Sequence, residues 1–313
     1  MPNYKKIFNL LLIIAAYGFL GYKILTYDNY AELWSHFVDA SPWQWTAIAC
    51  CVALFPLNRF FESCKWRFLV RGIEPMNLME AQRQVYYGTI AGFVTPYKLG
   101  EYPGRAMLFR HTQQNWLTAT CLGLVGGYAM TVVIIAFGLP AAVTWLMPAR
   151  SVMWSIILTL VVALAMFILL PAVMRRLQYP SWQSEQSRQL VSMLAQLGAY
   201  EVLVLIGLSL MRYLCFVLQL FLALRFCGVA LSLPEMMLTL PLYYMLITVT
   251  PNVPAAEIAV RGAWAVAVFE PFGADLSAAA TIAAMLVWAV NTICPLLVGT
   301  AIAMHLRQDF VKK

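Results

Sequence analysis

Two stretches of the sequence carry a glutamate followed, four residues later, by an arginine. Glu101 precedes Arg105 in the stretch VTPYKLGEYPGRAM, and Glu257 precedes Arg261 in the stretch VTPNVPAAEIAVRGAW. Residues four apart share one face of a helix, so each glutamate can pair with its arginine. A guanidinium near an opened helix N-terminus can hold a phosphate through two parallel hydrogen bonds. These residues predict either an anion-binding site or two structural ion pairs that fix each stretch to its surroundings.

Each stretch also begins with the tripeptide Val-Thr-Pro, which predicts a break in a helix. Pro96 and Pro251 lack a backbone donor, and the preceding Thr95 and Thr250 can satisfy the freed backbone groups or contact a ligand. The shared tripeptide and the shared Glu-x-x-x-Arg spacing predict an internal repeat. All four residues are therefore candidates for substrate binding, together with the two glutamates and the two arginines.

The composition places these charges in a membrane. Of the 313 residues, 62% are hydrophobic and 11% are charged, and the mean hydropathy is +0.74. A soluble domain has about a quarter charged residues, so the excess apolar surface must be solvated by lipid. The sequence therefore predicts an all-α integral membrane protein whose partners are membrane lipids.

The net charge of +7 is typical of cytoplasmic loops, because no basic run with interleaved aromatic residues predicts nucleic-acid binding. The seven cysteines lack CxxC spacing, and the three histidines lie far apart in the sequence. We therefore expect neither a metal site nor a cofactor.

Six apolar stretches are long enough to cross a bilayer, which needs about 20 helical residues. They are 7–25, 43–69, 116–139, 152–174, 200–225 and 277–304. Two shorter stretches, near 84–96 and 236–250, end at the Val-Thr-Pro breaks and predict re-entrant helical hairpins.

Three full crossings separate the helices that precede the two hairpins, so the two copies are expected to face opposite leaflets. The whole chain, 1–313, is then one transmembrane domain with an inverted-topology repeat, about 43–140 and about 200–305. Such hairpins can meet only near the middle of the bilayer. We therefore expect Arg105 and Arg261 to converge there, each beside its own glutamate.

Loop charges predict that both termini are cytoplasmic, because Lys and Arg accumulate on that side of a membrane. The basic residues that support this are Lys5 and Lys6, the lysines and arginines from Arg59 to Arg110, and then Arg175, Arg176, Arg188, Arg307, Lys312 and Lys313. By contrast, the segment 26–42 contains neither Lys nor Arg.

Two further arginines are candidate site residues. Arg59 lies near the cytoplasmic end of the second predicted span and could line the cavity of the first hairpin. By default Arg59 and its neighbours Glu62, Lys65 and Arg67 are expected to extend to the lipid headgroups, and the cavity is the alternative for Asn58 and Arg59. Arg212 lies well inside the fifth predicted span, where a charge usually marks a functional pathway.

With these residues in place, the chain resembles the lysylphosphatidylglycerol synthase transmembrane family, also called the flippase-like domain family. The most specific part is the block that contains Pro96, Gly100, Glu101 and Arg105, and the similarity extends over nearly the whole chain. The resemblance implies that the protein moves or presents a lipid with a charged, phosphate-containing headgroup. It also implies the cytoplasmic membrane of a prokaryote as the location.

The second block of the family is only partly matched. Pro251 and Arg261 fit, but residues 253–255 replace the glycines of the family, and Gly262 stands where a glutamate is expected. Glu257 can supply the carboxylate from one turn earlier. Larger family members carry a soluble aminoacyl-transfer domain, for which these 313 residues leave no room, so we expect no synthase activity.

Two other functions remain open from the residues alone. One is a membrane-embedded transferase that acts on a lipid carrier, for which only Glu101 and Glu257 qualify as acid or base. The other is a secondary transporter of a small solute, for which an inverted repeat is equally natural.

Overall fold

The computed structural model describes residues 38, 40–93, 95, 98–109, 112–146, 161, 198–250 and 256–311. The predicted spans 7–25 and 152–174, the N-terminus, Pro96 and Pro251 lie outside these residues. The helices are α3 (Pro42–Val70), α4 (Leu78–Phe93), α5 (Glu101–Ala106), α6 (Thr112–Leu146), α9 (Ala199–Phe226), α10 (Leu233–Val249), α11 (Glu257–Phe269), η4 (Glu270–Phe272) and α12 (Ala274–Val311). The described ranges contain no β-strand.

Four of the described helices are long and apolar enough to cross a membrane, and they confirm the predicted fold class. They are Pro42–Val70, Asn115–Leu146, Ala199–Phe226 and Ala274–Met304, at the predicted positions 43–69, 116–139, 200–225 and 277–304. Two of the helices run further than the predicted spans, because α6 continues past Pro140 to Leu146 and α12 continues past residue 304 to Val311. A membrane helix tolerates proline when its neighbours satisfy the freed backbone group.

Helices α3 and α10 begin with the same capping arrangement. The backbone N–H of Ser41 donates to Gln44 Oε1 at 2.8 Å, and the N–H of Gln44 donates back to Ser41 Oγ at 3.4 Å. The N–H of Ser232 donates to Glu235 Oε2 at 2.7 Å. These bonds satisfy backbone donors that have no partner within a helix, and so fix where both helices start.

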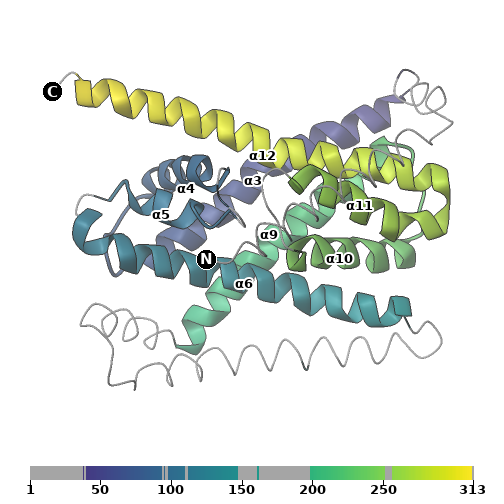
Figure 1. Cartoon of the computed structure of the whole chain (residues 1–313), viewed down its shortest axis with the longest axis horizontal. Coiled ribbons are helices and arrows are strands. Elements are labelled where there is room, and N and C mark those ends of the chain that lie inside the picture. Colours follow the sequence, from purple (N-terminus) through teal and green to yellow (C-terminus); the bar gives the residue numbers. More distant parts are fainter. Residues whose placement is uncertain are drawn as a thin grey trace, which may run out of the picture.

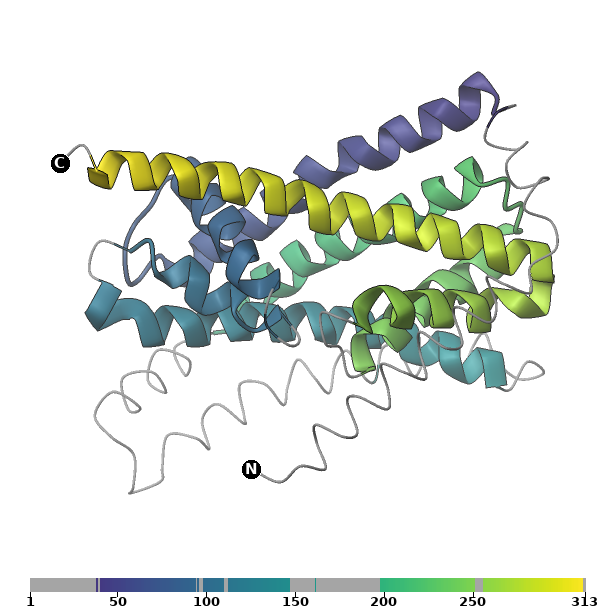
Figure 2. The ribbon, with the colours of Figure 1, turned by 45° about the horizontal axis from the view of Figure 1, so that its top comes forward.

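The helices form one elongated bundle in which two helix pairs occupy opposite ends (Figures 1 and 2). The first pair is α4 with α5, and the second is α10 with α11. Helices α3 and α9 cross between the pairs and pack extensively on each other. Helix α6 packs on α5 and on α10, and α12 packs on α4 and on α11, so each of these two long helices contacts both pairs.

Each helix pair has its own apolar core. The first core, around α4 and α5, includes Trp66 and Leu205, and the second core, around α10 and α11, includes Cys51 and Tyr213. On α3, the buried polar residues between 58 and 65 lie between the two cores. The bundle is therefore two apolar bodies separated by a polar layer.

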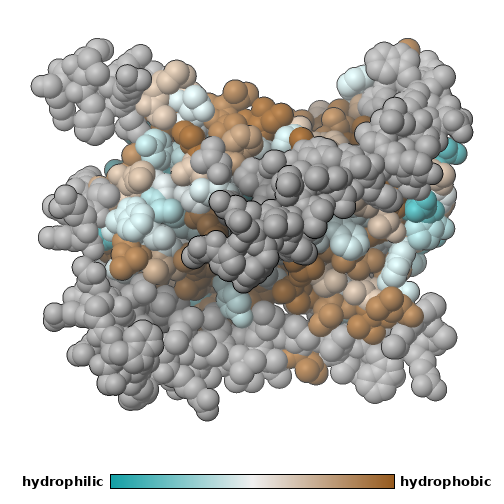
Figure 3. All heavy atoms as spheres, viewed as in Figure 1, coloured by the Kyte–Doolittle hydropathy of each residue, from teal (hydrophilic) through white to brown (hydrophobic). Residues whose placement is uncertain are grey.

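The outer surface between the two ends of the bundle is largely apolar, as expected of a surface that contacts lipid. Figure 3 shows apolar side chains over the middle of the bundle and polar ones mainly toward the ends of its long axis. Exposed large apolar residues occur on each long helix, among them Leu57, Leu124, Leu218 and Leu297. A water-soluble protein does not expose such residues along every long helix.

Glycines allow α4 to lie directly against α5. A Cβ atom at Gly88 would lie 2.5 Å from Arg105 Cγ and 2.5 Å from the carbonyl oxygen of Glu101. A Cβ at Gly104 would lie 3.0 Å from the side chain of Ala91. The contact fixes the backbone of the short helix that carries Glu101 and Arg105.

Replacing Gly88 with alanine is expected to lower the free energy of unfolding by about 1–3 kcal/mol, the usual cost of overpacking. The matched control is Gly207→Ala in α9, where a Cβ atom would meet nothing within 4 Å. That control should be neutral or slightly stabilising, because alanine favours a helix. Thermal unfolding of both variants in detergent provides the measurement, and equal midpoints would contradict the close contact.

Candidate functional site

The predicted ion pair of the first helix pair is present, but its arginine also contacts a second carboxylate. Arg105 donates from Nη2 to Glu101 Oε1 at 2.6 Å, and its Nη1 lies 2.6 Å from Glu62 Oε1. Arg105 is almost completely buried, at 2% exposure. Because Glu62 belongs to α3, the guanidinium connects α5 to the crossing helices.

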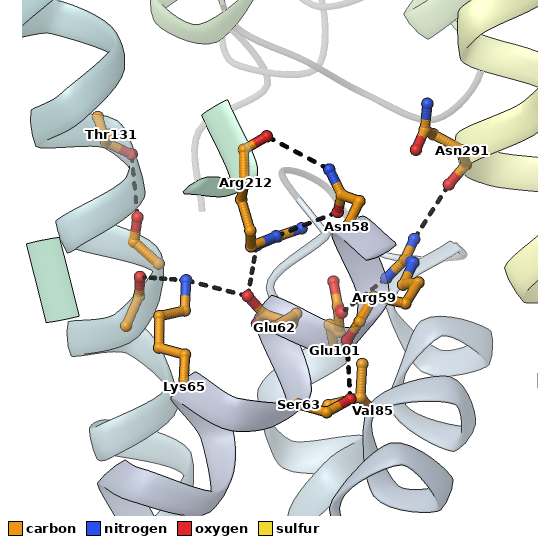
Figure 4. A network of polar contacts seen from close by, with 12 residues as sticks. Asn58, Arg59, Glu62, Ser63, Lys65, Val85, Glu101, Thr131, Arg212 and Asn291 are labelled. Carbon is orange, nitrogen blue, oxygen red and sulfur yellow. Dashed lines mark hydrogen bonds and ion pairs between the residues drawn. The ribbon is translucent and has the colours of Figure 1, made fainter. Parts of the chain in front are cut away.

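Glu62 accepts from cations of three different helices. Besides Arg105, it contacts Lys65 Nζ at 3.0 Å and Arg212 Nη1 of α9. Lys65 Nζ also donates to the backbone carbonyl of Gly126 in α6, at 3.0 Å. Figure 4 shows Lys65 and Arg212 converging on Glu62 from different sides. We call Glu62, Lys65, Arg105 and Arg212 the Glu62 cluster.

Arg212 and Arg59, both candidates from the sequence, extend the contacts of this cluster to Asn58 and to α12. Arg212 Nε donates to Asn58 Oδ1 at 3.2 Å. Arg59 donates from Nη2 to the backbone carbonyl of Asn291 in α12 at 3.0 Å, and its Nη1 lies 3.8 Å from Glu101 Oε1 (Figure 4). The structure therefore brings Arg59, Arg212, Glu101 and Arg105 together.

The expectation that Glu62 and Lys65 reach the lipid headgroups is wrong. Their exposures are 3% and 1%, because α6 and α9 pack over this face of α3. Arg67 remains exposed. The spacing of Asn58, Glu62 and Lys65 (four and then three residues) places them on one helix face, and this was the signal that could have identified them.

The second predicted ion pair is also present, and it contacts the first helix pair through a lysine that the sequence did not single out. Glu257 Oε1 accepts from Arg261 Nη2 at 3.1 Å and Nε at 3.3 Å. The same oxygen lies 3.0 Å from Lys98 Nζ, in the segment before α5. Lys98 has a φ of 56°, uncommon for a residue other than glycine. We call Lys98, Glu257 and Arg261 the junction, because they connect the two helix pairs.

The two candidate threonines act on the backbone of their own helix pair. Thr95 Oγ1 donates to the carbonyl of Ala91 at 3.1 Å and accepts from the N–H of Gly100 at 2.8 Å. Thr250 Oγ1 donates to the carbonyl of Leu246 at 2.7 Å and accepts from Trp264 Nε1 at 2.8 Å. Each hydroxyl thus connects the end of the first helix to residues that follow the break.

Cations outnumber carboxylates in this polar layer. The cations are Arg59, Lys65, Lys98, Arg105, Arg212 and Arg261, and the carboxylates are Glu62, Glu101 and Glu257. The Nε atoms of Arg59 and Arg105 are buried and have no hydrogen-bond partner in the described part of the chain. Three of the cations (Arg59, Lys65 and Arg105) are buried, and a local excess of positive charge with unused donors favours an anionic ligand.

The cations of the junction are more exposed to solvent than those of the Glu62 cluster. The side chains of Lys98 and Arg261 are 39% and 21% exposed, whereas those of Lys65 and Arg105 are 2% and 3% exposed. A ligand can therefore reach the junction directly, whereas Lys65 and Arg105 of the Glu62 cluster are covered by the surrounding helices. Among the described residues, no three His, Cys, Asp or Glu side chains are grouped so as to hold a metal ion.

The sequence was also compared with known proteins. The family model described as the lysylphosphatidylglycerol synthase TM region matches residues 7–299. No match was found among the curated proteins or among the solved structures.

Proposed function

Because the chain belongs to the lysylphosphatidylglycerol synthase TM region family, we propose that it moves or presents a lipid with a phosphate-containing headgroup across the cytoplasmic membrane of a prokaryote. The observation that carries this proposal is the excess of three cations in the polar layer inside a lipid-facing bundle. Charge inside a membrane is costly unless it is compensated, and three of the six cations (Arg59, Lys65 and Arg105) are buried. The excess over the three carboxylates therefore favours binding of a further anion.

The arrangement of the helix pairs supports an inverted repeat. The pairs lie at opposite ends of the bundle (Figure 1), each has a threonine that caps the break, and each has a Glu–Arg pair after it. In the proposed mechanism each pair enters the membrane from its own side. The headgroup then passes through the polar layer between them while the acyl chains stay in lipid.

We further propose that the lipid is moved without covalent change. The carboxylates that could act as acid or base, Glu101 and Glu257, are both held in ion pairs with neighbouring cations. Such pairing favours the ionised form and suits recognition of charge more than proton transfer to a substrate.

The test uses the purified protein in liposomes that contain a trace of acyl-labelled fluorescent phosphatidylglycerol. Dithionite added outside quenches only the outer leaflet, so the rate of further quenching measures movement of lipid between leaflets. We expect the protein to accelerate phosphatidylglycerol but not acyl-labelled glucosylceramide, which is neutral and has no phosphate. Equal acceleration of both lipids would contradict recognition of a phosphate.

Arg59→Gln is expected to slow the movement of phosphatidylglycerol about 10- to 100-fold, the effect of one lost charge-assisted hydrogen bond of roughly 1.5–3 kcal/mol. The matched control is Arg71→Gln, because Arg71 pairs with Glu201 on the surface and its side chain is 51% exposed. The control should move lipid at the rate of the unmodified protein. Equal rates for Arg59→Gln and Arg71→Gln would remove Arg59 from the site.

A further inference from the structure

One oxygen atom of Glu257 holds together the junction between the two helix pairs. Glu257 Oε1 lies 3.0 Å from Lys98 Nζ of the first pair and 3.1 Å from Arg261 Nη2 of its own helix. The side chain of Glu257 is only 6% exposed, although both of its cations are partly open. A phosphate carries several oxygens, so it can contact both cations in place of this single carboxylate oxygen.

Among the three carboxylates of the polar layer, Glu257 is the one that a ligand would displace first. The cations around Glu62, such as Lys65 and Arg105, have side chains only 2% and 3% exposed. Lys98 and Arg261 are reached without unpacking a helix, because their side chains are 39% and 21% exposed.

A displaced Glu257 would be a buried carboxylate whose two cations are engaged elsewhere. An isolated buried carboxylate is strongly disfavoured in its ionised form, so it binds a proton from water instead. The charge balance agrees with this outcome. The junction holds two cations and one carboxylate, a net charge of +1. After a singly charged phosphate diester and a proton have both arrived, its net charge is again +1.

We propose that Glu257 takes up one proton when a headgroup phosphate binds Lys98 and Arg261, so that the lipid and a proton move through the protein together. This inference rests on the proposed function and adds the coupled ion to it. The proton passes from solvent to a carboxylate oxygen of Glu257, and it leaves when the phosphate departs and the ion pairs form again.

The other ionisable groups near the junction are less suited to bind this proton. Glu101 also interacts with Lys98, but it stays paired with Arg105 and Arg59 when Lys98 binds a phosphate. Asp275 lies in the first turn of α12, beyond η4. Helix α11 packs on α10, α12 and η4. From α10, Tyr243 interacts with Glu257, but a tyrosine stays neutral below about pH 10. Glu270 of η4 lies 13 residues further along, about 20 Å by helical rise. Residues 276–304 of α12 include no Asp, Glu, Lys, Arg or His.

The experiment is calorimetric titration of the purified protein in detergent with dioctanoyl phosphatidylglycerol. Titrations at pH 7 in two buffers with different heats of ionisation give the number of protons taken up per lipid bound. We expect about one proton for the unmodified protein and about none for Glu257→Gln, which should still bind the lipid. The matched control is Glu201→Gln on the surface of α9, which should retain the uptake of about one proton.

The outcomes separate this inference from the proposed function. Binding without proton uptake by the unmodified protein would overturn the inference and leave the proposed function standing. Uptake that persists in Glu257→Gln would also overturn it, because another group would then bind the proton. If the unmodified protein binds no phosphatidylglycerol, the proposed function is contradicted, and the inference that rests on it is contradicted too.

A second measurement needs no variant and so does not depend on whether Glu257→Gln folds. Uptake of one proton on binding requires that the affinity of the unmodified protein rise about tenfold for each unit by which the pH falls, between about pH 8 and pH 6. The affinity rises as the pH falls because Glu257 is ionised in the free protein and protonated in the complex. The phosphate diester keeps its charge over this range, so an affinity independent of pH would overturn the inference.

Discussion

Replacement of Glu62 by alanine is expected to lower the free energy of unfolding by about 3–5 kcal/mol, the usual cost of removing one partner of a buried ion pair. The carboxylate is shared by Lys65, Arg105 and Arg212, which come from three helices. Without it, these cations would face one another within a buried layer. Chemical or thermal unfolding in detergent, with yield from the membrane as a second readout, measures the loss.

The control for this prediction is Glu201→Ala, which breaks the surface pair with Arg71 and the bond from the Gly198 N–H, and which should cost much less stability than Glu62→Ala because Glu201 is exposed to solvent. A double variant provides a further check. Adding Arg212→Met to Glu62→Ala removes one of the uncompensated cations, so it should recover part of the stability lost by Glu62→Ala alone. A Glu62→Ala protein as stable as the Glu201→Ala control would show that the three cations find other partners.

Arg105 is expected to show the largest effect on lipid movement. Arg105→Ala removes charge-assisted hydrogen bonds to both Glu62 and Glu101, and the loss of two such bonds corresponds to a rate about 100-fold lower or more. Arg105→Lys keeps the charge, but one ammonium cannot span two carboxylates as a planar guanidinium does. We expect a rate about tenfold lower for the lysine variant.

Lipid movement by both Arg105 variants is measured in the liposome assay, and the unfolding midpoint of each variant is measured in parallel. Arg71→Lys on the surface is the matched control. Only the fraction of protein that remains folded should be counted, because Arg105 also connects α5 to α3. Full activity of Arg105→Lys would show that the two-carboxylate contact has a structural role alone.

The features of the fold that depend on hydropathy could be predicted from the sequence. The four described spans lie where long apolar stretches predicted them, because length and apolar character are what a bilayer demands of a helix. The end of the span in α6 was predicted too early, at 139, whereas the span in α12 ends at Met304 as predicted. Helix α6 continues through Pro140, and α12 reaches Val311, seven residues past the last predicted one.

The site could be predicted only where local spacing determines a contact. The pairs Glu101–Arg105 and Glu257–Arg261 follow from a four-residue spacing on a helix, and the sequence is enough to expect them. Arg212 was suspected because it interrupts an apolar helix. The burial of Glu62 depends on which helices cover α3, and the contact of Lys98 depends on where two distant segments meet. Spacing places Asn58, Glu62 and Lys65 on one helix face, but it does not say which helices cover that face or which segment Lys98 meets.

The placement of the polar layer between two apolar cores has a mechanical consequence. Close-packed apolar side chains interlock, so each core resists internal shear and moves as a stiff block. The polar layer, by contrast, is held together by ion pairs between six cations and three carboxylates. These pairs can exchange, because a carboxylate that leaves one cation can form an ion pair with a neighbouring cation. The polar layer between the two cores is thus the part of the bundle that rearranges most easily. Because α3 and α9 run through both cores, such a rearrangement exchanges ion-pair partners within the layer and leaves both cores packed.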